Sequence, residues 1–468
     1  MIKLLKFIRK VNAKYLVILL LVVALSAFLR FYKLDWRAGF DADSEEIAFR
    51  ALGILNGHPA LLGPKTSVGG FAIGPLFSYL WAFFDLLFGT DPIVGSYLAV
   101  AVGVATTIAV YFAGKLFFDK KLGVILSLIW GVSLSRVLAD QGPWAPSIFY
   151  LAEIIFLAGA YIAVKKPYGL IISAFGFALG FNSHFGIFLS ALSLFAFWIF
   201  YRPQTDVKSI FASAGIIFMG ALPNLIFDLR HNFENFKRLF LIFEKNTNAM
   251  PPDTLKIFRT VAELNISTFH IYPPIIISVA VFLFILFFGL WYLNKDAKNK
   301  ALLTLLIVSI VVPCAVFIFY RSTFSEYYLM MTIPPFLFLV GYMIKRLIEG
   351  GKITLVLLFV VIFSIINIKS NLSYVRVRSL AAKKSAVEFV VNHGGKSGYG
   401  VSLSTELGWN YGYNYLFQFY GASPDIPPKK GEKKIFTIVV PPGFAGITAR
   451  KDFGGIGVLW EGYEIKDY

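Results

Sequence analysis

Long apolar runs, separated by short tracts that contain lysine and arginine, recur along most of the chain. A helix that crosses a bilayer needs about 20 predominantly apolar residues, and shorter segments are tolerated where the bilayer thins or protein surrounds them. The runs lie near residues 15–31, 74–89, 92–114, 122–139, 144–164, 168–201, 209–228, 271–293, 300–320, 326–344 and 352–368. This pattern predicts a polytopic membrane protein that is largely helical.

Two of these runs are ambiguous by length. Run 74–89 is short and contains Asp85, whereas run 168–201 is too long for one helix and is interrupted by "NSH" at 182–184. Because cytoplasmic loops are enriched in lysine and arginine, the basic flank before the first run places the N-terminus in the cytoplasm. The other basic tracts share that side only if 74–89 does not cross and 168–201 crosses twice. The sequence therefore predicts eleven spans, with 32–91, 229–270 and 370–468 outside.

Composition and charge agree with this assignment. Hydrophobic residues make up 57% of the 468 residues and charged residues only 15%, below the roughly 25% of a soluble domain. The net charge is +17, and the lysines and arginines mostly lie in short tracts between apolar runs, which indicates membrane topology and contact with anionic lipids rather than nucleic acid. The single cysteine, Cys314, excludes an internal disulfide and a cysteine-ligated metal site.

The first predicted outer loop is acidic where it begins. "FDADSEEIAFR" places four carboxylates close together, on Asp41, Asp43, Glu45 and Glu46. The apolar positions that follow have a helical period, so 44–57 is predicted to be an amphipathic helix on the membrane, with Asp43 or Ser44 as its N-cap. The carboxylates have two interpretations that the residues leave open. They cap and solvate the helix start, or one of them removes a proton from a hydroxyl group.

The composition changes after Lys369. A helical pattern over 379–394 is followed by three strand-like segments, "YGVSLST", "KKIFTIVVPP" and "GVLWEGYEI". The sequence therefore predicts a membrane domain over 1–369 and a small extracytoplasmic α+β domain over 370–468.

Several motifs resemble those of the C-type (GT-C) membrane glycosyltransferases, the group that contains protein O-mannosyltransferases, aminoarabinose transferases and oligosaccharyltransferases. Their first outer loop carries an acidic motif before a surface helix and then a Pro-Leu-aromatic helix, which "GFDADSEEIAFRALGILNG" and "GPLFSYLWAFFDLLFG" match. Weaker similarities are "SLSRVLADQGPW", "GFNSHFGIFLS", "ALPNLIFDLRHNF" and "SEYYLMMTIPP". Together they cover residues from about 15 to 345 and fall on one side of the predicted topology.

The resemblance implies a GT-C fold and transfer of a sugar from a polyprenyl-phosphate carrier to a lipid, protein or glycan acceptor, with inversion at the anomeric carbon. It places the family's loop aspartate on Asp43. Ser44 stands where a glutamate usually follows, so Glu45 and Glu46, with Asp41, are the alternative acids. A bacterial or archaeal plasma membrane is the implied location.

Such a displacement needs a base on the acceptor side and positive charge near the departing phosphate. The candidates for this charge are Lys65 and, at the outer end of the seventh span, Arg230 with His231. Arginine suits phosphate because its fork of donors matches the oxygens. The alternatives are a solvated loop lysine and an arginine that snorkels to the interface.

The remaining candidates lie near the predicted outer ends of later spans. Asp140 follows Arg136 by four residues, so the two either form a structural ion pair or contribute separately, Arg136 to substrate and Asp140 with Asp43 to a divalent cation such as Mg²⁺ or Mn²⁺. His184 and Glu326 are candidate substrate contacts, and the alternative for His184 is a hydrogen-bonded residue of the membrane interface. Glu153 lies halfway into the fourth span, where an ionisable group indicates either function or burial in the neutral form.

Two other classes of function stay open. A secondary transporter or lipid flippase would place ionisable residues near the membrane midplane. In this sequence the charge inside predicted spans is nearly limited to Glu153, whereas the carboxylates gather in a predicted outer loop. A non-catalytic membrane protein that binds glycans would keep the outer domain and need no base.

Overall fold

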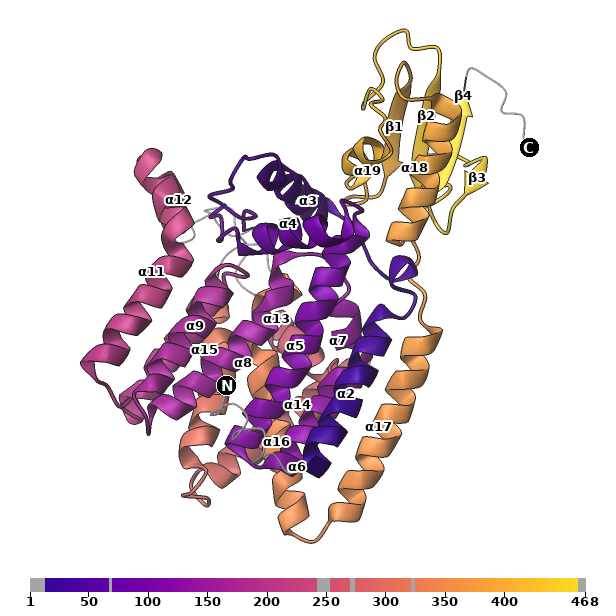
Figure 1. Ribbon diagram of the computed structural model, residues 1–468. Coiled ribbons are helices and arrows are strands. Elements are labelled where there is room, and N and C mark those ends of the chain that lie inside the picture. Colours follow the sequence, from indigo (N-terminus) through magenta and orange to yellow (C-terminus); the bar gives the residue numbers. More distant parts are fainter. Residues whose placement is uncertain (1–12, 67–69, 242–252, 270–273, 321–324, 462–468) are drawn as a thin grey trace.

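The computed structural model describes residues 13–66, 70–241, 253–269, 274–320 and 325–461. Figure 1 shows a bundle of helices that carries surface helices and a small separate domain at one end. The predicted combination of a helical membrane domain and a C-terminal α+β domain is confirmed.

Eight helices within the described ranges are long and apolar enough to cross a membrane. They are α2 (Ala13–Phe31), α5 (Ile93–Phe117), α8 (Phe149–Ala163) with η2 (Ala145–Ile148), α11 (Val207–Arg230), α14 (Ile275–Leu293), α15 (Lys300–Ile318), α16 (Ile333–Glu349) with η3 (Glu326–Thr332), and α17 (Ile353–Ser373). The chain is thus a multi-pass membrane protein.

Shorter helices form the long ambiguous run and one further run. The run 168–201 forms α9 (Tyr168–Phe181) and α10 (Ile187–Phe200), which meet at the predicted polar break. The run 122–139, expected as one helix, is divided at Ser133 into α6 (Lys120–Val132) and α7 (Leu134–Ala139). The predicted total of eleven spans stays a prediction.

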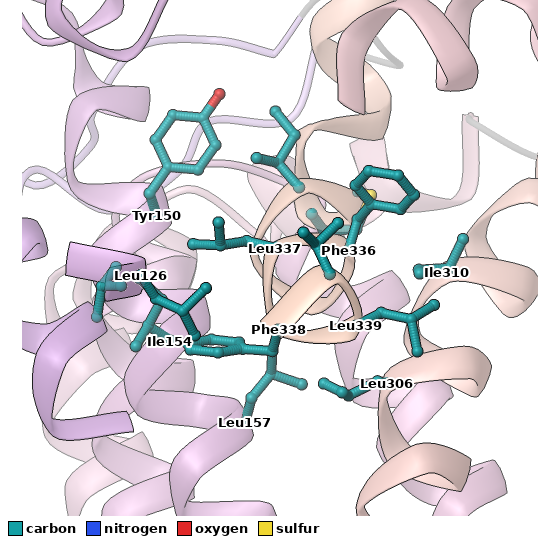
Figure 2. Packing of buried hydrophobic residues seen from close by; sticks show 14 of the residues in the cluster. Leu126, Tyr150, Ile154, Leu157, Leu306, Ile310, Phe336, Leu337, Phe338 and Leu339 are labelled. Atoms are coloured by element: carbon teal, nitrogen blue, oxygen red, sulfur yellow. The ribbon is translucent and has the colours of Figure 1, made fainter. Parts of the chain in front are cut away.

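The core of the bundle surrounds α16. Four consecutive side chains of this helix, Phe336 to Leu339, are almost fully buried, so α16 is covered on all sides by other helices. Figure 2 shows these residues between Leu126, Ile154, Leu157 and Leu306 of neighbouring helices. The part of α16 before Lys345 is apolar on every face, as is expected of a helix at such a central position.

The predicted first outer loop, residues 32–91, forms surface helices. After η1 (Leu34–Trp36), α3 (Ala42–Leu55) and α4 (Leu76–Phe88) lie across the end of the bundle in Figure 1. The predicted amphipathic helix is present, but its N-cap is Asp41 and not Asp43 or Ser44. Asp41 has the extended backbone that an N-cap requires, whereas residues 43 and 44 already lie inside the helix.

Two further helices lie between α11 and α14, namely α12 (Glu234–Leu241) and α13 (Thr254–Ile266). In Figure 1, α12 continues beyond the end of α11 on the same side of the bundle as α3 and α4. This arrangement places the end of α11 beside the first outer loop.

The C-terminal domain has a four-stranded sheet of order β1-β2-β4-β3. Strands β1 (Gly400–Thr405) and β2 (Ile435–Val440) are parallel with Gly400 opposite Ile435, and β2 is antiparallel to β4 (Gly457–Glu461). The other elements are β3 (Lys451–Asp452), α18 (Leu380–Gly394), α19 (Tyr413–Phe419) and η4 (Phe444–Gly446). Since α17 continues to Ser373, the predicted boundary between 369 and 370 falls inside its last turn, and the division into two domains stays a prediction.

Candidate active site

The start of α3 brings the acidic residues of the first outer loop together. Asp41 Oδ1 accepts hydrogen bonds from the Ser44 amide at 3.1 Å and from the Ser44 hydroxyl at 2.8 Å. This carboxylate therefore closes the first turn of the helix, which is the capping interpretation of the acidic loop.

Asp43 lies in the first turn of α3 with an exposed side chain. Within the part of the chain that the structure describes, its carboxylate has no ion pair and no hydrogen bond. Protein atoms nevertheless crowd around it, and this partial burial, with the charges of Asp41 and Glu46, raises the pKa of Asp43 to about 6. An accessible carboxylate with such a pKa can accept a proton near neutral pH.

The two glutamates of the same turn already have partners. Glu45 is 6% exposed, and its two oxygens accept hydrogen bonds from the amides of Gly412 and Tyr415, both at 2.9 Å. Glu46 is exposed and forms an ion pair with Arg50. Of the four candidate acids, Asp43 is the one whose carboxylate has no hydrogen bond or ion pair in the described structure.

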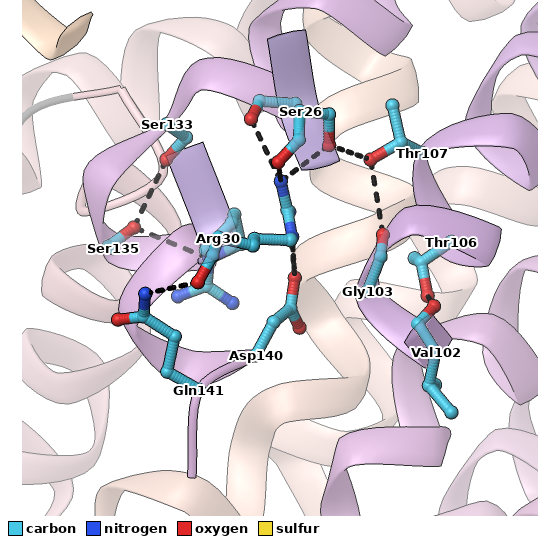
Figure 3. Close-up of polar contacts among 12 residues, drawn as sticks. Ser26, Arg30, Val102, Gly103, Thr106, Thr107, Ser133, Ser135, Asp140 and Gln141 are labelled. Atoms are coloured by element: carbon cyan, nitrogen blue, oxygen red, sulfur yellow. Dashed lines mark hydrogen bonds and ion pairs between the residues drawn. The ribbon is translucent and has the colours of Figure 1, made fainter. Parts of the chain in front are cut away.

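A buried polar network occupies the contact of α2 with α5, α6 and α7 (Figure 3). Arg30 donates from Nε and Nη2 to Oδ2 of Asp140, at 2.9 and 2.7 Å, and from Nη1 to Ser26 Oγ at 2.5 Å. The sequence suggested that Asp140 pairs with Arg136, four residues earlier. Asp140 pairs with Arg30 instead, because the last turn of α2 places the Arg30 guanidinium next to the end of α7.

Arg136 consequently remains a buried cation without a carboxylate partner among the described residues. Its side chain lies over the rings of Tyr150 and Trp130, with 5.1 and 5.8 Å from the guanidinium carbon to the ring centroids. Nε donates to Ser135 Oγ at 3.3 Å, whereas the buried Nη1 has no hydrogen bond to any described residue. An unused donor on a buried guanidinium favours the binding of an anion.

The segment with Lys65 packs against the C-terminal end of α11. The Ala72 amide donates to Asn235 Oδ1 at 2.7 Å, and Asn224 Nδ2 donates to the Ala72 carbonyl at 2.9 Å. Lys65 itself is exposed and its charge lies close enough to Glu234 to favour the ionised carboxylate there. Arg230 is exposed at the last position of α11. The structure thus brings the Lys65 segment and the Arg230 helix together.

The three remaining candidates differ in their surroundings. His231 stacks on Phe227 with 4.1 Å between ring centroids, and its Nδ1 lies 2.8 Å from the Phe227 carbonyl oxygen. His184 is buried between Phe149 and Tyr327, and its Nδ1 accepts from the Gly186 amide at 3.0 Å. Glu326 is exposed at the start of η3.

The described residues do not fit the divalent cation site suggested for Asp43 and Asp140. Oδ2 of Asp140 is shared by two Arg30 donors, and Arg136 adds a second positive charge nearby, which disfavours a cation at that carboxylate. The described ranges contain no group of three histidine, cysteine or acidic side chains that could hold a metal ion.

Two residues that organise this region were missed by the sequence reasoning. Arg30 carries a charge inside the first apolar run, and that position is itself a signal, because ionisable groups in spans usually have a partner. Lys383 of α18 is 1% exposed and binds the first outer loop, yet its sequence neighbourhood "LAAKKSAVEF" gives no indication that it is buried.

No protein-family model and no curated protein matches the sequence. Solved structures do match. The aminoarabinose transferase ArnT from Cupriavidus metallidurans, bound to undecaprenyl phosphate, aligns with a TM-score of 0.61 and 12% identity over 94% of this chain and 97% of that chain.

The oligosaccharyltransferase AglB from Archaeoglobus fulgidus is also similar. Its complex with an inhibitory peptide and a dolichol-phosphate aligns with a TM-score of 0.51 and 13% identity over 90% of this chain and 60% of that chain. Its complex with Zn and sulfate has the same TM-score and identity, over 89% and 58%. Both proteins are GT-C membrane glycosyltransferases, so the chain has the GT-C fold.

Proposed function

We propose that the chain is an inverting glycosyltransferase that moves a sugar from a polyprenyl-phosphate carrier to an acceptor hydroxyl at the outer face of a plasma membrane. The observation that carries the proposal is the accessible carboxylate of Asp43 at the start of α3, which has no partner among the described residues. The fold adds support, because two proteins that share it have been solved with undecaprenyl phosphate or a dolichol-phosphate bound.

In the proposed reaction Asp43 accepts the proton of the acceptor hydroxyl while the oxygen of that hydroxyl attacks the anomeric carbon of the donor sugar. The bond between that carbon and the phosphate oxygen breaks, and the electron pair leaves with the phosphate of the carrier. Attack from the face opposite the leaving group inverts the anomeric carbon. The leaving phosphate is a stable anion, so the protein needs to supply positive charge rather than a strong acid.

Arg136 is the first candidate for binding that phosphate, because its guanidinium is buried and Nη1 is unused. Its neighbour Asp140 binds Arg30 in the last turn of α2, so α7 ends on the same side of the bundle as α3. Lys65 and Arg230 are exposed on that side and are the candidates for the more accessible part of the carrier headgroup. His231, His184 and Glu326 are proposed only as contacts to the sugar or the acceptor.

The rival class, a transporter or flippase, would rest on Glu153. This residue is fully buried in α8, where a charge would be costly. Glu153→Gln should leave sugar transfer within about twofold of wild type if the residue is a neutral part of the packing. Loss of lipid translocation without loss of transfer would favour the rival.

The proposal is tested in two steps with the full chain. Native mass spectrometry of the purified protein should detect a complex with undecaprenyl phosphate that saturates as the lipid is titrated. Mass spectrometry of lipid extracts and surface glycans should then show a sugar-sized mass difference between cells with and without the protein. Absence of both the complex and the mass difference would contradict the proposed function.

A further inference from the structure

The C-terminal domain reaches into the acidic segment through a buried lysine. Lys383 of α18 is 1% exposed, and its Nζ donates to the carbonyl oxygen of Phe40 at 2.6 Å and of Tyr411 at 2.7 Å. Phe40 immediately precedes the N-cap of α3. The ammonium group thus links the backbone before the helix to the loop that leads into α19.

A buried carboxylate makes the reciprocal contact. The two oxygens of Glu45 in α3 accept from the amides of Gly412 and Tyr415 at the start of α19. Gly412 has φ of +89°, and a Cβ at this position would lie 2.8 Å from the Phe40 carbonyl oxygen and 3.0 Å from Lys383 Nζ. Glycine is therefore required at position 412, because the backbone has a positive φ and because the Phe40 and Lys383 segments lie so close.

Tyr415 fixes the same junction from a third direction. Its hydroxyl donates to the Thr90 carbonyl at 2.9 Å, and its ring packs edge-on against Phe49 with 5.1 Å between centroids. Thr90 ends the first outer loop and Phe49 lies on α3, so one side chain of α19 touches both. The two parts of the chain form one hydrogen-bonded unit here.

Joining two surfaces through buried charged groups costs desolvation free energy. Burial lowers the pKa of Lys383 to about 8, although the nearby charges of Asp41 and Glu45 oppose this shift. Apolar side chains of similar size would hold the surfaces together at least as well, whereas charged groups specify one geometry of the backbone atoms that they bind. Lys383 thus fixes the Phe40 carbonyl, three residues before Asp43. Glu45, two residues after Asp43, is fixed by the Gly412 and Tyr415 amides, which donate to its carboxylate.

We propose that Glu45 and Lys383 are positioning residues, through which the C-terminal domain holds the Phe40–Glu45 segment so that the Asp43 carboxylate faces the acceptor. The two anchored positions, Phe40 and Glu45, lie on either side of Asp43 in the sequence, and neither Glu45 nor Lys383 has a side-chain hydrogen bond or ion pair with Asp43 in the described structure. The inference rests on the proposed function, since it assigns the base of that reaction to the anchored segment. It makes the C-terminal domain part of the active site rather than a separate acceptor-binding module.

The test compares Glu45→Gln and Lys383→Met with Lys384→Met. Gln keeps the shape of Glu45 but turns an NH₂ group toward one of the two amide donors, and Met removes the ammonium of Lys383. Lys384 is the matched control, because it lies on the same helix and also binds the first outer loop, through Asp91 at 2.6 Å, but is half-buried. Amide hydrogen exchange of residues 40–48 should be at least about tenfold faster in both test variants and within about twofold of wild type in the control.

A second measurement separates positioning from general damage. In cells that lack the native protein, each test variant should lower the glycan mass signal at least about tenfold, while the affinity of the purified variant for undecaprenyl phosphate stays within about twofold of wild type. If Lys383→Met does not fold, Glu45→Gln alone decides the outcome. Unchanged exchange over 40–48, or equal losses of transfer and lipid affinity, would overturn the inference. Failure of the wild-type chain to bind the lipid and to change the glycans would instead overturn the proposed function.

Discussion

Two aspartates at the same end of the bundle are in opposite physical states. Asp140 is 2% exposed, and one of its oxygens receives two donors of Arg30 within a network that joins α2 to α7. Asp43 is exposed at the start of α3, has no cationic partner in the described residues, and has a pKa raised to about 6. The first carboxylate is committed to structure, whereas the second is free to exchange a proton.

The acidic residues of the first turn of α3 differ in the contacts that they make. In the first turn of α3 one acid caps the helix, one binds the C-terminal domain and one forms a surface ion pair. These contacts leave Asp43 without a cationic partner among the described residues, and partial burial together with the charges of Asp41 and Glu46 raises the pKa of Asp43. The acidic segment is therefore both a structural joint and a candidate catalytic base.

Removal of the Asp43 carboxylate should have the largest effect on activity. Asp43→Asn keeps the side-chain volume but eliminates the proton acceptor, and loss of general base catalysis costs about 10²- to 10⁴-fold in rate. The glycan mass signal in complemented cells should disappear, while undecaprenyl phosphate still binds the purified variant. Transfer at the wild-type level would remove Asp43 from the mechanism.

The equivalent change at the other aspartate should act on stability. Asp140→Asn leaves the fully buried Arg30 without its counter-charge, and breaking a buried ion pair in this way costs about 3–5 kcal/mol. The midpoint of thermal unfolding in detergent should fall markedly. The double variant Arg30→Met/Asp140→Leu should recover most of this loss, because no lone charge remains. A midpoint unchanged by Asp140→Asn would contradict the structural role.

Arg136 tests whether the unused guanidinium beside Asp140 binds the carrier. A charged hydrogen bond contributes about 1.5–3 kcal/mol, so Arg136→Met should weaken undecaprenyl phosphate binding by about tenfold to a hundredfold. Lys65→Met and Arg230→Met should have smaller effects, because these side chains are exposed and more strongly hydrated. Titration by native mass spectrometry measures all three. An unchanged affinity in Arg136→Met would leave the buried cation without this role.

The pH dependence of transfer sharpens the comparison further. A base with a pKa of about 6 is mostly ionised at pH 7 and mostly protonated at pH 5, so the rate should fall about tenfold as the pH drops across this range. The loss should be reversible, because it reflects protonation of Asp43 and not unfolding. A rate that is independent of pH between 5 and 7 would contradict the assignment.

Glu46 should produce the smallest change. The exposed pair of Glu46 with Arg50 contributes less than about 1 kcal/mol to stability, so Glu46→Gln should hardly alter thermal unfolding. It should nevertheless move the acidic limb of the pH profile to lower pH, since a negative charge that raises the pKa of Asp43 is removed. An acidic limb that stays in place would show that this charge does not reach Asp43.

Local patterns in the sequence predicted the local structure well. The period of Ile47, Ala48 and Ala51 predicted the buried face of α3, and all three are fully buried. The strand-like segments of the C-terminal domain appear as β1, β2 and β4. Such elements follow from the spacing of apolar residues, which a single sequence displays directly.

Contacts between distant segments could not be predicted in the same way. Several residues near 41–44 can cap a helix chemically, and Asp41 does so in a backbone that Lys383 holds from α18. The spacing of Arg136 and Asp140 suggested a local pair, but Asp140 binds Arg30 across 110 positions of the chain. Which charge meets which depends on the packing of helices, and the sequence gives no measure of that distance.

The account depends most directly on the Asp43 carboxylate being accessible from the outer face of the membrane. A single introduced cysteine can report this accessibility, because Cys314 is the only cysteine of the chain and can be replaced by alanine. In that background Asp43→Cys should react with a membrane-impermeant maleimide in intact cells, as readily as after permeabilisation. Labelling that occurs only after permeabilisation would place α3 in the cytosol and contradict the proposed transfer to an outer acceptor.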